Sequence, residues 1–252
     1  MFIIEVVNLF SQSILFRKEN GFMKFEFKNT YKHVIVYVND KNELHRDNGA
    51  AYIEYIIDEY DNKKILTKLK WYKNGNLHNE IGPAIKKFTR YNNKDVIFLE
   101  EYYTNGKVNR INGPAMIRYR IDGTIIQENW FKDGKIHRKN GPAIIEYFGK
   151  KVSREQYYIN GIKHRVDGPA YLEYSISNNK VRCCEYYLNG VRRKSEDIEP
   201  ILCRIKDGTL INKINAYGVK RLKLIKIICE GMELDDIVEK IDNKLLLEKL
   251  AK

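Results

Sequence analysis

A short repeated motif constrains the fold of this chain more than any other feature of its sequence. The clearest copy, RKNGPAIIEY, begins at Arg138, and the related segments RDNGAAYIEY, NEIGPAIKKF, RINGPAMIRY and RVDGPAYLEY begin at Arg46, Asn79, Arg110 and Arg165. Successive glycines of this motif are 33, 31, 28 and 27 residues apart. Self-similarity at such a period predicts an array of stacked structural units, each in contact with its neighbours only.

A second motif precedes the first at a fixed spacing in the sequence. The segments WYKNG, YYTNG, WFKDG, YYING and YYLNG end at Gly75, Gly106, Gly134, Gly161 and Gly190. The first four of these glycines lie seven residues before the glycine of a Gly-Pro pair, namely Gly82–Pro83, Gly113–Pro114, Gly141–Pro142 and Gly168–Pro169. The chain therefore contains five units with a fixed core, plus a partial sixth, joined by connections of variable length.

The residue types in this core predict β-hairpins. Asn-Gly and Asp-Gly suit a two-residue type I′ turn, in which both central residues need a positive φ. After the Gly-Pro pair the chain alternates, with Ala143, Ile145 and Tyr147 on one face and Ile144 and Glu146 on the other. A proline is tolerated at the first position of a strand. We expect a mainly β protein: an elongated antiparallel array of β-hairpins.

The unit NG-x-x-HR-x-x-GPA resembles the MORN-like repeats of proteins encoded by giant DNA viruses and large phages, over about residues 40–194. The resemblance implies a MORN-like single sheet and a viral origin, and few members of the family have a known activity. The chain departs from the pattern at several points: Asn109 replaces the histidine, Asn79 the arginine and Ala50 the proline, and the first unit has no Asn-Gly turn.

The two ends differ from the array. Residues 1–40 contain the alternating segments KFEF and HVIVYV, which predict an N-terminal cap of strands, with a short helix before them. Residues 195–252 carry apolar residues at helical spacing over 196–206 and 219–229, and a further helix follows Gly231. We expect three regions: the cap (1–40), the array (41–194) and a small α-helical C-terminal cap (195–252).

The C-terminal region allows a second interpretation. The stretch LIKIICEGMELDDIVEKI is similar to the entry of a helix-turn-helix. A DNA-reading helix needs side chains that contact bases and phosphates, yet residues 195–252 hold 11 Lys and Arg against 11 Asp and Glu. An ordinary helical hairpin that closes the last repeat is therefore favoured.

Positive charge is concentrated in the repeats. The net charge is +12, and residues 41–194 hold 29 Lys and Arg against 18 Asp and Glu, a local net charge of +11. Such a surface attracts anionic lipid, nucleic acid or an acidic protein. A solvated basic face with no dedicated partner is an equally good explanation.

Several features bear on location. The cysteines are Cys183, Cys184, Cys203 and Cys229, without a CxxC motif, which predicts reduced thiols and an intracellular location, in host cytoplasm or in a virion if the protein is viral. The apolar N-terminus contains Glu5 and no basic residue before Arg17, unlike a signal peptide. No apolar run is long enough for a transmembrane helix.

The histidines of the motif could suggest chemistry, but their repetition argues for architecture. His45, His78, His137 and His164 occupy one register. Equivalent residues in successive hairpins lie about 10 Å apart, too far to share a metal ion, and no copy has a distinct catalytic partner. We expect them to bond the neighbouring turn or to pack on tyrosines.

The motif arginines and the paired aromatics are the candidate binding residues. We expect Arg46, Arg110, Arg138 and Arg165 to stack on aromatic rings or to pair with strand glutamates such as Glu54, Glu146 and Glu173. A row of these arginines beside Trp71 and Trp130 could instead form a platform for single-stranded nucleic acid or a glycan. In the favoured interpretation, one set of paired aromatics is core and the other a half-exposed ladder.

No P-loop, GxSxG, HExxH or dinucleotide fingerprint occurs in the sequence. We therefore expect a non-enzymatic repeat scaffold that mediates protein–protein contact, without a catalytic residue, metal or cofactor. Binding to an anionic membrane surface is the alternative, and nucleic-acid binding is the third hypothesis.

Overall fold

The structure, a computed structural model, describes residues 14–19 and 21–194. The chain divides into two compact units, Met1–Gly134 and Lys135–Lys252. Among the described residues every regular element is a β-strand, and the described strand pairs are antiparallel. The predicted mainly β array of antiparallel hairpins is thereby confirmed.

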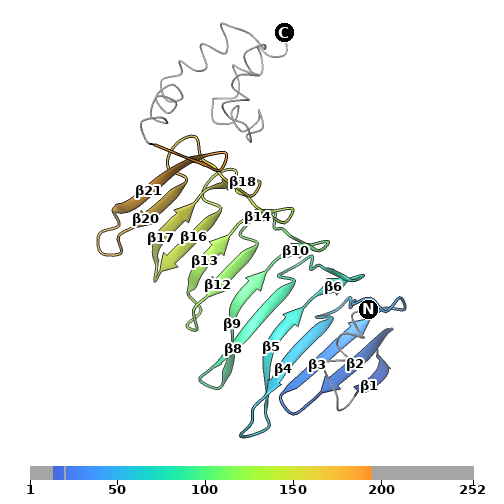
Figure 1. Cartoon of the computed structure of the whole chain (residues 1–252). Helices are drawn as coiled ribbons and strands as arrows, with labels where there is room; N and C mark the ends of the chain where they lie inside the picture. Colours follow the sequence, from blue (N-terminus) through green and yellow to red (C-terminus); the bar gives the residue numbers. More distant parts are fainter. Residues whose placement is uncertain (1–13, 20, 195–252) are drawn as a thin grey trace, which may run out of the picture. The chain divides into compact units, whose positions relative to one another are not determined.

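In the first unit the long strands form one sheet in chain order (Figure 1). They are β1 (Ile14–Glu19), β2 (Phe22–Lys28), β3 (Lys32–Val38), β4 (Tyr52–Ile57), β5 (Lys64–Lys70), β8 (Ile85–Tyr91), β9 (Lys94–Glu101), β12 (Met116–Tyr119) and β13 (Ile125–Asn129). Because β3 pairs with β4, the N-terminal strands continue the sheet of the repeats.

The second unit repeats this organisation. Its long strands are β16 (Ile144–Phe148), β17 (Lys151–Gln156), β20 (Tyr171–Tyr174) and β21 (Val181–Leu188), and the short β22 (Val191–Arg193) pairs with the end of β21. Here too, sequence neighbours pair antiparallel.

Each repeat also carries a short hairpin at one end of its long strands. These hairpins use β6 (Tyr72–Lys73) with β7 (Asn76–Leu77), β10 (Tyr103–Thr104) with β11 (Lys107–Val108), and β18 (Tyr158–Ile159) with β19 (Ile162–Lys163); β14 (Phe131–Lys132) and β15 (Lys135–Ile136) occupy the same positions in their repeat. At the turn of β6–β7, Asn74 has a φ of 48° and Gly75 a φ of 76°. Both central residues thus have the positive φ predicted for a type I′ turn.

A β-bulge recurs in the long hairpin of each of the five repeats, from β4–β5 to β20–β21. The register shifts between a charged residue and the aromatic that follows it, at Glu54/Tyr55, Lys87/Phe88, Arg118/Tyr119, Glu146/Tyr147 and Glu173/Tyr174. A bulge places one extra residue on one strand and increases the local twist. Its regular position makes it part of the repeat.

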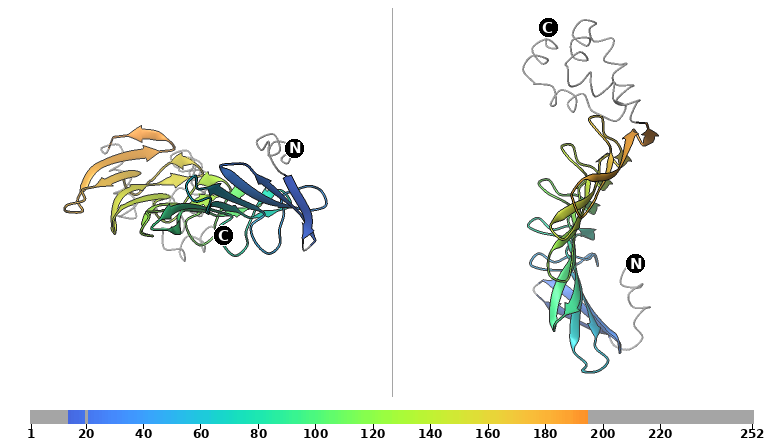
Figure 2. Two further views of the ribbon diagram at one scale, coloured as in Figure 1. Left: turned by 90° about the horizontal axis from the view of Figure 1, so that it is seen from below. Right: turned by 90° about the vertical axis from the view of Figure 1, so that its left-hand side faces the viewer.

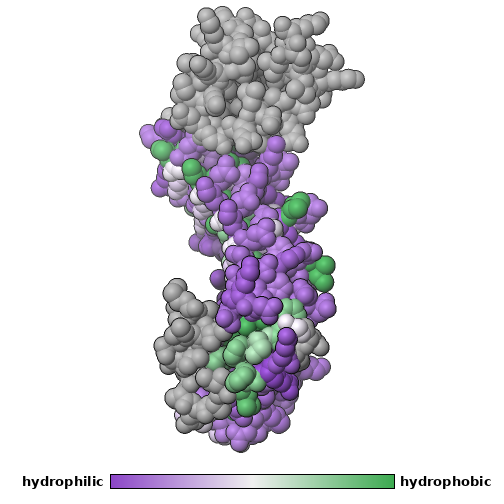
Figure 3. Space-filling view, turned by 90° about the vertical axis from the view of Figure 1, so that its right-hand side faces the viewer, coloured by the Kyte–Doolittle hydropathy of each residue, from purple (hydrophilic) through white to green (hydrophobic). Residues whose placement is uncertain are grey.

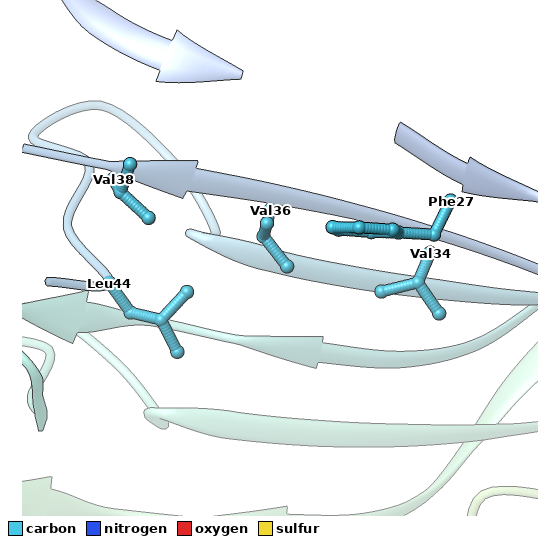
Figure 4. Close-up of a cluster of buried hydrophobic side chains, with 5 residues drawn as sticks. All are labelled: Phe27, Val34, Val36, Val38 and Leu44. Atoms are coloured by element: carbon cyan, nitrogen blue, oxygen red, sulfur yellow. The ribbon is translucent and has the colours of Figure 1, made fainter. Parts of the chain in front are cut away.

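Each unit is a single layer of strands (Figure 2), so few side chains are fully enclosed. A cluster of buried side chains lies at the N-terminal end of the described part of the first unit, where Phe27, Val34, Val36, Val38 and Leu44 point to the same side of the sheet (Figure 4). The expectation that one aromatic set is core and the other a ladder is wrong, because both sets are half-buried. A single layer offers no second sheet against which one set could be buried.

The expected end caps are described only in part. The predicted N-terminal strands are present as β2 and β3. The short helix expected before them and the helices expected in residues 195–252 lie outside the described residues. Within the part of the chain that the structure describes, no helix could cross a bilayer.

Candidate functional site

The histidine of each motif is bonded to the turn of the following repeat. Its Nδ1 atom accepts a hydrogen bond from the backbone N–H of the turn residue that precedes glycine. The pairs are His45 with Asn74 (3.0 Å), His78 with Asn105 (3.2 Å), His137 with Asn160 (3.1 Å) and His164 with Asn189 (3.0 Å). An imidazole that accepts through Nδ1 is neutral and carries its hydrogen on Nε2. The histidines thus bond the neighbouring turn, as predicted.

Asn109, which stands in the place of the histidine, makes the equivalent bond. Oδ1 of Asn109 accepts a hydrogen bond of 3.4 Å from the N–H of Asp133 in the next turn. A second bond accompanies the first in each joint: the turn glycine donates to the carbonyl that precedes the histidine, for example from Gly75 to Leu44 over 2.9 Å. Two backbone donors of every turn are therefore satisfied by the preceding repeat.

The motif arginine holds the loop that carries it. The Cζ atoms of Arg46, Arg110 and Arg165 lie 3.9, 3.8 and 3.9 Å from the ring centroids of Tyr37, Tyr102 and Tyr157. Nη1 of the motif arginine also donates to the carbonyl four residues later, in the pairs Arg46–Ala50, Arg110–Pro114, Arg138–Pro142 and Arg165–Pro169. The predicted stacking on aromatic rings is thereby confirmed for three arginines.

In four of the five repeats the motif glycine packs against this arginine. A Cβ built on Gly49, whose φ is 129°, would lie 3.2 Å from Nη1 of Arg46, closer than such atoms normally approach. Asn79 preserves the loop bond without a guanidinium, since its Nδ2 donates to the carbonyl of Pro83 over 2.9 Å. The motif alanine is also constrained: Ala115 and its equivalents are 0% exposed.

The strand glutamates pair with cations of the long strands. Glu146 contacts Arg154 (2.7 Å) and Glu173 contacts Arg182 (3.3 Å). Glu54 contacts Lys32 (2.8 Å) and Lys68 (3.3 Å), and accepts a 2.6 Å hydrogen bond from the Tyr52 hydroxyl. Burial alone would raise the pKa of Glu54, but the hydrogen bonds from Lys32 and Tyr52 and the charge of Lys68 lower it to about 2. Glu54 therefore remains a carboxylate inside the sheet.

The loop contacts of the motif arginines bear on whether these side chains can form the predicted binding platform. The four candidate arginines are half-buried, and each donates to its own loop. Trp71 and Trp130 are half-buried at the position where the other repeats place Tyr102 and Tyr157. The platform thus stays a prediction, with much of each guanidinium already engaged.

Lys163 is a departure from the repeat that the sequence comparison did not single out. Other repeats have Leu44, Leu77, Val108 or Ile136 at this register. Nζ of Lys163 lies 5.7, 5.2 and 4.9 Å from the ring centroids of three tyrosines, Tyr158, Tyr171 and Tyr187. The ammonium is thus held by aromatic faces where other repeats place an aliphatic side chain.

Two positions per motif lie between the arginine and the glycine, and their residues are Asp47–Asn48, Glu80–Ile81, Ile111–Asn112, Lys139–Asn140 and Val166–Asp167. All of these residues are exposed except Val166, which is buried. In the first unit Ile81 is 99% exposed and Ile111 is 91% exposed, on consecutive loops. Figure 3 shows one side of the molecule as largely hydrophilic, with some hydrophobic side chains standing out singly and a group of adjacent hydrophobic residues toward the lower end of the view. The repeated bonds fix the frame of each loop, and the side chains at these two positions differ from loop to loop.

Clefts separate consecutive loops. In the first unit a cleft of about 380 Å³ lies between the loops that contain Asp47 and Glu80, with Trp71 in its wall. In the second unit a cleft of about 260 Å³ lies between the loops that contain Lys139 and Asp167, with Tyr157 in its wall. Sequence reasoning missed the clefts because their walls come from residues about 30 positions apart.

Neither a metal site in the described residues nor similarity to known proteins indicates a function for this chain. In residues 14–19 and 21–194, no group of three His, Cys, Asp or Glu side chains could hold a metal ion. No family model and no curated protein matches this chain. Among solved structures, the chain is similar to the pneumococcal O-GlcNAc transferase GtfA in complex with UDP and GlcNAc, at 14% identity and a TM-score of 0.23. The match covers 60% of this chain and 22% of that one, and carries no argument on fold or function.

Proposed function

We propose that this protein is a non-enzymatic repeat scaffold that binds a protein partner through its motif loops. The observation that carries the proposal is the exposure of Ile81 (99%) and Ile111 (91%) on consecutive loops. Two strands separate equivalent positions in successive repeats, so these side chains lie about 10 Å apart. Exposed apolar groups with polar neighbours are typical of protein interaction sites.

The rigidity of the loop frame supports a binding role. Binding residues are often loop residues positioned by a rigid scaffold. Here the histidine joint, the arginine stack and the buried alanine fix each loop, while the residues between arginine and glycine vary. The resemblance of the repeats to MORN-like repeats of giant viruses and large phages agrees with a scaffold of viral origin.

Quantitative affinity purification from infected host cells would test the proposal. The immobilised full-length chain is compared with the double variant Ile81→Ser, Ile111→Ser. The matched control is Tyr60→Ser, because Tyr60 is 98% exposed in the same unit but lies in the β4–β5 connection, at the other end of the hairpin. We expect a defined protein to be retained by the wild type and the control and lost by the double variant. A set of bound proteins that is identical for all three baits would contradict the proposal.

The basic charge favours a second candidate, attachment to an anionic membrane surface. Residues 41–194 carry a net charge of +11, and such attraction weakens as salt is raised. Flotation with phosphatidylserine vesicles at low and high salt would detect it, and a labelled oligonucleotide would test nucleic acid in the same way. Binding to neutral vesicles at any salt concentration would argue against an electrostatic mechanism.

A further inference from the structure

The two clefts between consecutive motif loops are built from equivalent positions but differ in charge. The cleft of the second unit (the second-unit cleft) is lined by three cations and one carboxylate, a net charge of +2; these residues are Arg138, Lys139, Arg165 and Asp167. The cleft of the first unit (the first-unit cleft) is lined by two cations and two carboxylates, namely Arg46, Lys73, Asp47 and Glu80. Of these two clefts, only the second-unit cleft therefore has a surplus of positive charge.

The second-unit cleft also has apolar side chains where the first unit has polar ones. In the first-unit cleft, Nζ of Lys73 and Oε1 of Glu80 form an ion pair of 2.9 Å. The second-unit cleft has Ile159 and Val166 at the same two registers. Ile162 pairs with Ile159 in the short hairpin, is 48% exposed, and takes the register of an asparagine in the first unit. An apolar wall thus replaces an ion pair.

Arg165 retains hydrogen-bond donors for a ligand. A guanidinium carries five N–H donors. Nη1 of Arg165 donates to the carbonyl of Pro169 over 3.1 Å, and its Nε donates to Oδ1 of Asp167 over 2.8 Å. Within the described residues these bonds engage two of the five donors, so three remain for a group that enters the cleft. A carboxylate matches such donors in geometry and in charge.

We propose that the second-unit cleft binds an acidic side chain of a peptide segment whose neighbouring residues are apolar. The carboxylate accepts hydrogen bonds from Arg165 and lies beside Lys139, and an apolar neighbour packs on Ile159 and Ile162. A volume of about 260 Å³ is below the range of about 300–1,000 Å³ typical of small-molecule sites, and suits one inserted side chain. The inference rests on the proposed function, in which motif loops bind a protein partner, and adds the chemistry that the second unit selects.

The lining of the second-unit cleft favours a peptide over a nucleic acid. Single strands of nucleic acid are held by aromatic faces on which the bases stack. Tyr157 is the aromatic residue in this wall, and its ring already packs against the guanidinium of Arg165, with 3.9 Å from Cζ to the ring centroid. Ile159 and Val166 offer aliphatic surface instead, which suits an apolar side chain of a protein partner.

Fluorescence anisotropy of the full-length chain with a short labelled peptide of alternating Glu and Leu tests the site. A peptide of alternating Gln and Leu is the matched probe without carboxylates. We expect the first peptide to bind about tenfold more tightly, and salt to weaken its binding. Equal affinity for both peptides, or no binding at millimolar concentration, would overturn the carboxylate site. Displacement by inorganic phosphate or an oligonucleotide at a lower concentration than by the unlabelled acidic peptide would overturn the peptide assignment.

The first unit supplies substitutions that change the second-unit cleft and keep the loop frame. Lys139→Asp, and the pair Ile159→Lys with Val166→Glu, introduce the residues of the first-unit cleft. The matched control Lys150→Asp makes the same charge change at an exposed site between β16 and β17, at the other end of the hairpin. We expect both cleft variants to weaken peptide binding about tenfold and the control to retain it. An equal loss in the control would overturn the site, because net charge alone would then attract the peptide.

The reciprocal exchange tests whether these positions determine specificity. Asp47→Lys, Lys73→Ile and Glu80→Val together are expected to raise the number of bound peptides per chain from one to two. Unchanged stoichiometry, with a circular dichroism spectrum like that of the wild type, would overturn this assignment. The double variant Ile81→Ser, Ile111→Ser should bind the peptide as the wild type does, so failure of the proposed contact in the first unit is distinguished from failure of the cleft. Loss of the peptide in that variant would overturn the location in the second unit.

Discussion

Nδ1 of His164 accepts a hydrogen bond of 3.0 Å from the backbone N–H of Asn189, so the last described turn is tied to the repeat before it. His164 is 4% exposed, and loss of its acceptor would leave the turn donor without a partner in a partly buried site. This bond and its counterparts in the other repeats give a structural reason for the recurrence of histidine at one register.

Replacing His164 tests the joint. We expect His164→Ala to destabilise the turn by about 1–2 kcal/mol, since an unsatisfied buried donor costs that much. His164→Asn should cost less, because Asn109 makes the equivalent bond. Amide hydrogen exchange at Asn189 measures the local effect directly, and equal exchange rates in the two variants would contradict the role of the acceptor.

Two glycines at equivalent positions provide a matched pair. Gly49 has a φ of 129° and lies against the Arg46 guanidinium, whereas the nearest group to a Cβ on Gly82 is Nδ2 of Asn79 at 3.5 Å. We expect Gly49→Ala to cost about 2 kcal/mol from backbone strain and crowding, and Gly82→Ala less than about 1 kcal/mol. Urea unfolding of both variants measures the difference, and a larger loss in Gly82→Ala would contradict the packing argument.

The buried Glu54 carboxylate predicts a pH dependence. Its pKa in the folded chain is about 2, below the value of about 4.3 for an unfolded glutamate. A lowered pKa in the folded state stabilises the fold above the unfolded pKa, and this contribution is lost as the pH falls from about 4.5 toward 2. At about 1.4 kcal/mol per pKa unit the effect reaches a few kcal/mol.

Glu54→Gln is the control for this prediction. The variant is expected to be less stable than the wild type at pH 7, with the difference shrinking as the pH is lowered toward 2. Chemical unfolding at a series of pH values would show this convergence. A constant difference between the two proteins at every pH would mean that ionisation of Glu54 does not contribute to stability.

Substitutions at Lys163 can separate the contributions of charge and of packing to stability. We expect Lys163→Ala to cost about 1–2 kcal/mol, because it removes both the aliphatic stem and the ammonium from among three tyrosine rings. Lys163→Leu should retain most of the stability, since Leu44 and Leu77 occupy this register in other repeats. Thermal unfolding of both variants would decide, and equal losses would show that the ammonium itself is what the rings stabilise.

The sequence predicted the hairpins because the period and the turn residues agree locally. Asn74 and Gly75 alone indicate a type I′ turn, and the structure has it. The histidine at one register suggested a bond to a neighbouring turn, but its partner, such as Asn105 for His78, depends on how repeats stack. The bulge at Glu54/Tyr55 and the half-burial of both aromatic sets could not be predicted, since both depend on strand twist and on the single layer.

In each repeat the histidine, or Asn109 in its place, accepts a hydrogen bond from the turn of the following repeat. The backbone donors of that turn are equivalent from one joint to the next. Removing one whole internal unit would therefore bring an equivalent donor to an equivalent acceptor, and duplicating a unit would do the same. Arrays built in this way can change length by gene-level gain or loss of complete units, without an intermediate that contains a broken joint. Their binding loops are then free to diversify one unit at a time.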